Sequence, residues 1–109
     1  MEKICNVSDI PEGIMKGFTI KGRQILLANV DGKFYAMDAV CSHKSGYLPA
    51  GRLEKNIVIC PVHEAEFDVT TGKVIKNISS GVKMITGREA KDLNVFKVLL
   101  EGEDIYIEV

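Results

Sequence analysis

The chain has 109 residues, which is enough for one domain with a hydrophobic core that needs no disulfide staples. Its formal net charge is −1, and the 14 basic and 15 acidic residues are interspersed, so no basic stripe indicates nucleic-acid binding. No apolar run approaches the about 18 residues of a membrane-spanning helix, and the first residues lack a signal-peptide pattern. We therefore expect a cytoplasmic protein that binds neither nucleic acid nor a membrane.

Short β-like segments separated by turn residues fill the first half of the chain. Asp31-Gly32 lies between the apolar segments 24–30 and 34–37, and Asp-Gly is a strong signal for a two-residue β-hairpin turn. Residues 57–59 are Ile-Val-Ile and predict a short buried strand that ends at Cys60. These segments favour antiparallel β-structure.

The second half of the chain ends in another predicted hairpin. Segments 95–100 and 105–109 flank the turn residues Glu101–Asp104, and apolar residues alternate in the last segment, so we expect one face of it to be buried: Ile105, Ile107 and Val109. Residues 79–92 are the least strand-like stretch and predict a long loop. No segment has helical periodicity over three or four turns, and regularly spaced short strands predict an all-β sandwich or barrel-like fold.

Two short phrases with metal-binding residues stand out, Cys41-Ser42-His43 and Cys60-Pro61-Val62-His63. They contain both histidines and two of the three cysteines of the chain. Two thiolates and two imidazoles suit a binuclear site in which one iron binds both sulfurs and the other binds both nitrogens. That is the ligand set of a Rieske [2Fe–2S] centre, so the phrases predict one such cluster and a function in one-electron transfer.

One other assignment of these residues, a structural zinc site, is weaker. A zinc ion held by two cysteines and two histidines is chemically plausible, but structural zinc ligands usually follow C-x-x-C and H-x₃₋₅-H spacings rather than C-x-H. The third cysteine, Cys5, lies outside both phrases and is expected to be a small buried hydrophobe. Using Cys41 and Cys60 as ligands leaves no cysteine pair for a disulfide, which favours a reducing compartment.

The two phrases and their continuations resemble the Rieske ferredoxin family. Residues 41–51 are similar to the pattern C-x-H-x-G-x-x-L-x-x-G, and residues 60–72 are similar to C-P-x-H-G-x-x-F-D-x-x-T-G. The resemblance extends to segments 8–13, 30–37 and 101–107. It implies an antiparallel β-sandwich of Rieske type, with residues 1–109 forming one domain and residues 38–76, approximately, forming an inserted cluster-binding subdomain.

The sequence departs from the family pattern at two glycines, because Ser45 and Glu64 occupy their positions. Such glycines normally permit close backbone approach or a positive φ. High-potential members of the family carry an extra disulfide and two hydroxyl groups near the cluster, and this chain lacks all four residues: Gly46 and Val62 replace the cysteines, Ala65 the serine and Phe67 the tyrosine. We therefore expect a potential toward the low end of the roughly −150 to +300 mV Rieske range.

The resemblance implies a soluble electron carrier that accepts electrons from a reductase and passes them to a terminal oxygenase or another acceptor. The chain is not expected to be an enzyme, since a non-haem iron triad needs two further histidines and a carboxylate. The alternatives are a small Rieske-fold subunit of a larger, nitrite-reductase-like oxidoreductase and a structural zinc module.

Overall fold

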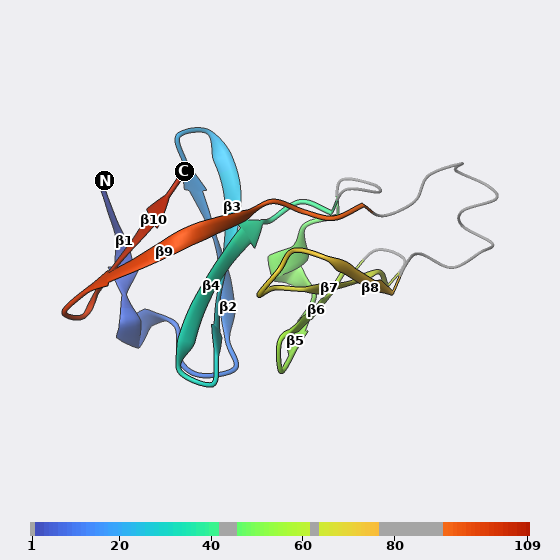
Figure 1. Ribbon diagram of the computed structural model, residues 1–109, viewed down its shortest axis with the longest axis horizontal. Helices are drawn as coiled ribbons and strands as arrows, with labels where there is room; N and C mark the ends of the chain where they lie inside the picture. The colour runs from blue at the N-terminus through green and yellow to red at the C-terminus, as the bar shows by residue number, and fades with distance from the viewer. Residues whose placement is uncertain (1, 42–45, 62–63, 77–90) are drawn as a thin grey trace.

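The computed structural model describes residues 2–41, 46–61, 64–76 and 91–109, and the regular elements among them are β-strands apart from two short 3-10 helices (Figure 1). The strands are short and are separated by tight turns, as the spacing of the turn residues predicts. In chain order the elements are β1 (Lys3–Asn6), the 3-10 helix η1 (Val7–Asp9), β2 (Met15–Ile20), β3 (Arg23–Val30), β4 (Lys33–Asp38), the 3-10 helix η2 (Leu48–Ala50), β5 (Arg52–Glu54), β6 (Ile57–Ile59), β7 (Glu66–Asp68), β8 (Val74–Lys76), β9 (Val95–Glu101) and β10 (Asp104–Glu108).

Six strands form the larger antiparallel sheet, in the order β1-β10-β9-β4-β3-β2. The predicted Asp31-Gly32 turn joins β3 to β4, and both turn residues have positive φ, 52° and 87°. A two-residue turn of that kind matches the twist of the flanking strands. The predicted C-terminal hairpin is also confirmed, because β9 pairs with β10 from Glu101 and Asp104 onward.

The smaller sheet contains β5, β6, β7 and β8 in that order and lies beyond one end of the larger sheet (Figure 1). In the sequence it falls between β4 and β9, which are neighbours in the larger sheet. Strand β6 covers the predicted residues Ile57–Ile59. Sheet architecture and the antiparallel pairing of all strands confirm the predicted all-β fold class.

Strand β3 is buried on both faces and separates two hydrophobic cores. Successive strand side chains point to opposite faces, so Leu26 and Ala28 enter one core while Ile25 and Leu27 enter the other. The first core extends toward the smaller sheet and includes these buried residues from outside β3: Met37, Ala39, Cys41, Leu48, Val58, Cys60, Ala65, Phe67 and Val69. The second core lies among the strands of the larger sheet.

One expectation about the last strand is wrong. Ile105 and Ile107 are buried as predicted, but Val109 is 42% exposed. Strand β10 ends at Glu108, whose partner is Lys97, so Val109 lies beyond the last paired residues. The predicted loop at 79–92 falls almost wholly outside the described residues.

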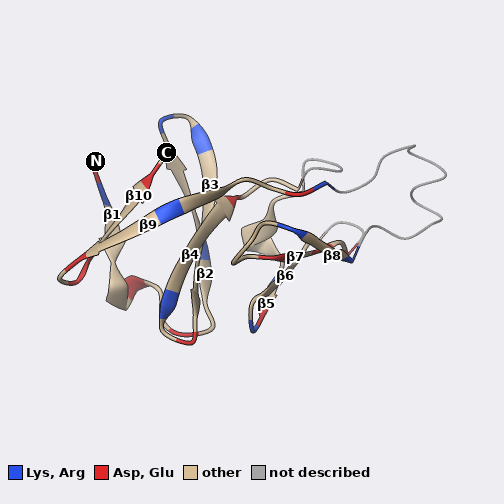
Figure 2. Cartoon of the chain, in the orientation of Figure 1, with Lys and Arg blue, Asp and Glu red and all other residues tan. Residues whose placement is uncertain are grey.

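Acidic and basic residues are scattered over both sheets and their turns (Figure 2), in keeping with the near-zero net charge. Ion pairs occur on the surface, for example between Arg23 and Asp38 at 3.0 Å and between Lys3 and Asp104 at 3.1 Å. Within the described ranges, no helix is long and apolar enough to cross a membrane.

Candidate metal centre

The first predicted ligand, Cys41, follows β4 at the end of the larger sheet that faces the smaller one. Its side chain is almost fully buried, and its N–H donates to the carbonyl of Gly46 at 2.7 Å. Just outside that bond, Val40 and Tyr47 form an isolated antiparallel bridge. Cys41 and Gly46 are therefore held together at the two ends of this segment.

The second predicted ligand, Cys60, follows β6 directly and has a similar frame. Its side chain is 1% exposed, and its N–H donates to the carbonyl of Ala65 at 2.8 Å. Between them, Glu64 has a left-handed backbone with φ of 56°. This conformation is the one for which glycine is favoured, and it explains why a glycine is expected at that place in the family pattern.

Both cysteines belong to the same buried core, together with Ala65 and Phe67. Cys41 follows β4 of the larger sheet and Cys60 follows β6 of the smaller one, so each sheet contributes one cysteine to this core. The other two predicted ligands, His43 and His63, lie outside the described residues. Among the residues that are described, no group of three or more His, Cys, Asp and Glu side chains could hold a metal ion.

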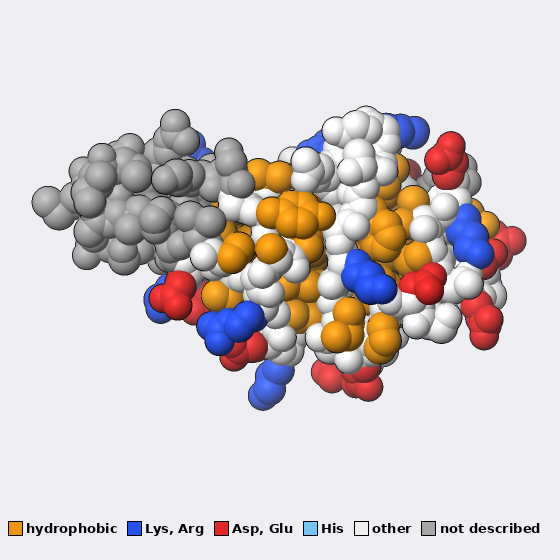
Figure 3. Space-filling view, turned by 180° about the vertical axis from the view of Figure 1, so that it is seen from behind, with side chains coloured by type: hydrophobic (Ala, Val, Ile, Leu, Met, Phe, Trp, Pro, Cys, Tyr) orange, Lys and Arg blue, Asp and Glu red, His pale blue; other side chains and the backbone are white. Residues whose placement is uncertain are grey.

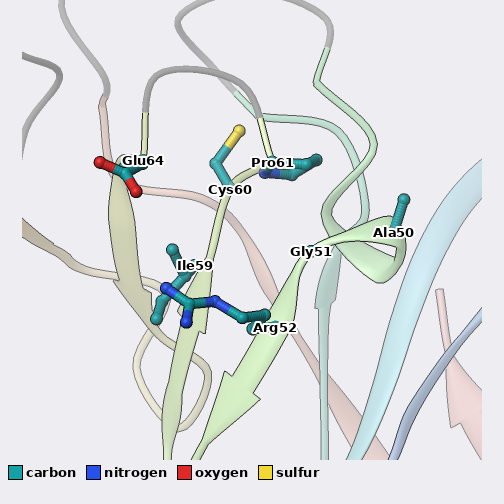
Figure 4. A pocket seen from close by; sticks show the side chains of 7 residues that line it. All are labelled: Ala50, Gly51, Arg52, Ile59, Cys60, Pro61 and Glu64. Atoms are coloured by element: carbon teal, nitrogen blue, oxygen red, sulfur yellow. The ribbon is translucent and has the colours of Figure 1, made fainter.

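Each cysteine lines its own surface cavity. Cys60 lies in a cavity of about 360 Å³, where its side chain is flanked by Pro61 and Glu64, with Arg52 on the same wall (Figure 4). Cys41 lines a second cavity of about 520 Å³ together with the Arg23–Asp38 ion pair. Both cysteine side chains are almost fully buried, yet each borders a cavity that is open to the surface.

Comparison with known proteins gives the same assignment as the two phrases. The Rieske [2Fe-2S] domain family matches residues 1–86. The ferredoxin component of biphenyl 2,3-dioxygenase from Rhodococcus jostii is 36% identical over the whole chain and 92% of that protein's length. The ferredoxin component of the naphthalene 1,2-dioxygenase system from Pseudomonas putida is 42% identical over 63% of this chain, but the match spans only 66% of that relative.

The chain belongs to the Rieske [2Fe-2S] domain family. The ferredoxin in a solved complex of reduced oxygenase and oxidised ferredoxin of carbazole 1,9a-dioxygenase has a TM-score of 0.80, with 27% identity over 97% of this chain and 90% of that chain. A ferredoxin of Sphingomonas yanoikuyae has a TM-score of 0.83 at 22% identity, over 99% of this chain and 97% of that chain, and shares the fold. This Rieske protein is an electron carrier rather than an enzyme, and its cofactor is one [2Fe–2S] cluster.

The described part of the site fits such a cluster. Two cysteines from separate loops are brought into one core, and their immediate neighbours Ala65, Phe67 and Leu48 are apolar and fully buried. A buried thiolate is costly unless a metal or another positive group compensates its charge. A metal would bind both side chains as thiolates and would compensate this charge.

A tight turn follows β7 at the end of the strand opposite to the second loop. The carboxylate of Asp68 accepts hydrogen bonds from the N–H and the hydroxyl of Thr70, at 2.9 and 2.6 Å. Burial alone would raise the pKa of Asp68, but these bonds and one from the Asn56 side chain hold the pKa below its ordinary value. At the end of the turn, the carbonyl of Gly72 accepts a hydrogen bond from the N–H of Leu93 at 2.7 Å. This bond connects the smaller sheet to the segment that precedes β9.

Cys5 is remote from this arrangement. It lies on β1, pairs with Ile105 of β10 and packs against the second core. Burial, followed by the nearby carboxylate of Asp9, raises the pKa of the Cys5 thiol. The expectation of a buried side chain is met only in part, because Cys5 is half-buried, and it lies outside the core that contains Cys41 and Cys60.

Sequence reasoning did not single out the contact between Gly17 and Tyr47, which joins β2 to the first loop. The two residues are far apart in the chain, and neither belongs to the metal phrases. One signal was available, because a glycine inside a strand pattern often marks a place where another group approaches the backbone closely.

Proposed function

We propose that Cys41, His43, Cys60 and His63 hold the [2Fe–2S] cluster, both thiolates on one iron and both imidazoles on the other. The burial of both cysteines in one core and the backbone bond that closes each loop support this assignment. A histidine follows each cysteine within three residues, as the ligand set requires. A bound cluster supplies a centre that takes up and releases one electron.

The proposed domain organisation follows from the path of the chain. Residues 1–109 would form a single Rieske domain, and approximately residues 38–76 would form its cluster-binding subdomain. The chain leaves the larger sheet after β4, builds the smaller sheet and rejoins the larger one at β9, which supports this division. The two cysteines then lie at the junction, where the subdomain's loops meet the larger sheet.

We further propose that this protein is a soluble, cytoplasmic ferredoxin that carries single electrons from a reductase to the terminal oxygenase of an aromatic-ring dioxygenase system. The observation that carries the proposal is the whole-chain relationship to the ferredoxin component of biphenyl 2,3-dioxygenase. Two cavities that open beside the cysteines would keep the route for an electron to a docked partner short.

The cluster assignment is tested on protein purified without oxygen. We expect about two irons and two sulfides per chain and, after dithionite reduction, a rhombic EPR signal with an average g below that of four-cysteine clusters. Cys41→Ser, His43→Ala, Cys60→Ser and His63→Ala should each abolish the signal. Cys5→Ser is the matched control and should leave it unchanged. Stoichiometric zinc without iron, or loss of the signal in Cys5→Ser, would refute the assignment.

The partner assignment needs a separate experiment. Reduced protein is mixed anaerobically with the oxidised oxygenase component of an aromatic-ring dioxygenase, and reoxidation is followed by visible absorbance. Rapid reoxidation that needs the oxygenase supports the proposal. A protein that holds its cluster but transfers no electron to such oxygenases would instead favour a subunit of another oxidoreductase.

A further inference from the structure

Gly17 lies in the middle of β2, an edge strand of the larger sheet. It pairs with Leu26 of β3, and residues paired in this way share a face of the sheet. Leu26 belongs to the core that also contains Cys41 and Cys60. Gly17 is therefore on the face of β2 that is directed toward the metal centre.

Tyr47 occupies the space where a side chain at position 17 would lie. A Cβ added to Gly17 would overlap the Tyr47 hydroxyl, and it would be 2.9 Å from Cζ of the same ring and 3.1 Å from Cγ of Pro49. Real Cβ atoms essentially never come that close to a ring. The phenol can rest on β2 only because residue 17 is glycine.

The backbone of Tyr47 closes the loop that starts at Cys41. Tyr47 forms an antiparallel β-bridge with Val40, the residue before Cys41. The carbonyl of Gly46 accepts a hydrogen bond from the N–H of Cys41. Immediately after Tyr47, the N–H of Leu48 donates to the carbonyl of Ala39 at 2.8 Å. A displacement of the Tyr47 ring would therefore be transmitted to both ends of this loop.

The ring itself is 42% exposed, so it is held mainly by the one surface that it covers. Figure 3 shows hydrophobic side chains over much of the middle of one face of the molecule, with charged side chains among them and along the edges. Cys41 is held in place by burial, whereas the Tyr47 side chain is held by a contact at the surface. The position of Tyr47 should therefore be sensitive to a small change in β2.

We propose that Gly17, Tyr47 and Pro49 form a seat that positions the first ligand loop on the larger sheet. Tyr47 and Gly17 are positioning residues in this arrangement, because they act on the cluster only through Cys41 and His43. The inference rests on the proposed ligand assignment. It adds that the environment of the cluster depends on a contact with β2, an element that contributes no ligand.

A double-mutant cycle tests the seat, using Gly17→Ala, Tyr47→Ala and the double variant. The readouts are the reduction potential, the EPR g values of the reduced cluster and the rate of cluster loss to a chelator. Gly17→Ala should shift the potential and the g values and accelerate cluster loss roughly tenfold, equivalent to about 1.4 kcal/mol, because overpacking forces the ring away. Tyr47→Ala should also accelerate loss, and adding Gly17→Ala to it should have little further effect, since the clash is gone.

Two controls make the cycle specific. Tyr47→Phe keeps the ring on Gly17 and should behave like the parent. Lys16→Ala changes the neighbouring, exposed residue of β2 and should leave all three readouts unchanged. If Gly17→Ala does not fold, the comparison of Tyr47→Ala with Tyr47→Phe still decides the question.

The inference is overturned if Gly17→Ala lowers only the melting temperature, if its effect is the same with and without Tyr47, or if Tyr47→Ala leaves the cluster unchanged. These outcomes differ from failure of the proposed function. A parent protein that holds no cluster would refute the ligand assignment and this inference with it.

Discussion

Glu64 is the residue at which this chain departs most clearly from its family pattern, and it adopts the backbone conformation that glycine would adopt there, with φ of 56°. Its side chain is exposed and lines the cavity beside Cys60 (Figure 4). Two separate effects follow at this position. The backbone is strained, and a negative charge lies next to a predicted ligand loop.

Three variants of Glu64 separate strain from charge. Glu64→Gly should stabilise the protein by about 0.5 kcal/mol, since left-handed conformations cost other residues ~1–2 kcal/mol and the chain entropy of glycine offsets part of the gain. Glu64→Ala and Glu64→Gln keep the strain and should not stabilise. All three should raise the reduction potential by roughly 10–30 mV at low salt, because a carboxylate disfavours electron uptake. Urea unfolding and voltammetry measure the two effects, and a potential unchanged in all three variants would exclude the electrostatic one.

Ala65 and Phe67 are fully buried in the core that contains both cysteines, which permits a test of the low-potential assignment. Ala65→Ser and Phe67→Tyr should each raise the reduction potential by about 40 mV, since a donor worth ~1 kcal/mol more to the reduced cluster shifts a one-electron couple by that amount. The double variant should raise it further. A protein-film titration of the four proteins provides the measurement. A downward shift in either single variant would mean that its hydroxyl is directed away from the cluster.

At the scale of elements, the turn from Asp68 to Gly72 holds β7 against β8 and connects the smaller sheet to β9. The carboxylate of Asp68 accepts two hydrogen bonds from Thr70. The N–H of Gly72 donates to the backbone carbonyl of Asp68 at 2.7 Å. The geometry depends on an ionised carboxylate, which is the better acceptor. The stability of this turn should therefore depend on pH.

The sign of that dependence follows from the lowered pKa of Asp68. A carboxylate with a folded-state pKa below its ordinary 3.8 stabilises the protein at higher pH, and the contribution is lost as the pH falls through the folded-state value. The melting temperatures of the parent and of Asp68→Asn should thus differ most above about pH 5 and converge as the pH falls below 3.8 through the lowered folded-state pKa. Asp31→Asn, in the exposed β3–β4 turn, controls for the loss of one negative charge. A parent–variant difference that stays constant with pH would contradict the assignment.

At the scale of the molecule, the two sheets differ in how independently they are supported. Strand β3 pairs on both sides and is buried on both faces, whereas each strand of the smaller sheet has only three residues. The core of the smaller sheet includes Cys41 and Cys60, the two described candidate ligands. Iron should consequently stabilise one end of the molecule more than the other.

Removal of the iron with a chelator tests this asymmetry. Amide hydrogen exchange in β5–β8 should accelerate strongly in the iron-free protein, because ligand binding is coupled to the folding of the segment that supplies the ligands. Exchange in β3 and β4 should change little. Mass spectrometry of peptides from the two forms gives the comparison. Equal acceleration in both sheets would show that the domain opens as one unit.

The sequence determined the elements and the chemistry of this protein, because both depend on local patterns. Asp31-Gly32 fixed a hairpin turn, and alternation placed Ile105 and Ile107 inside. The C-x-H and C-x-x-H phrases identified the family and its cofactor, since structural zinc sites with two cysteines and two histidines usually follow other spacings.

Only the tertiary structure decided which distant segments support the site. The exposure of Val109 depends on where the neighbouring strand ends, and the contact between Gly17 and Tyr47 depends on β2 and the first loop meeting across the sheet face. Neither could be deduced from a pattern within one segment, because packing partners separated by tens of residues are selected by the global fold. The same reason explains Glu64, whose strained conformation is tolerated because the paired strands β6 and β7 and the bond from Cys60 to Ala65 fix the chain on both sides of it.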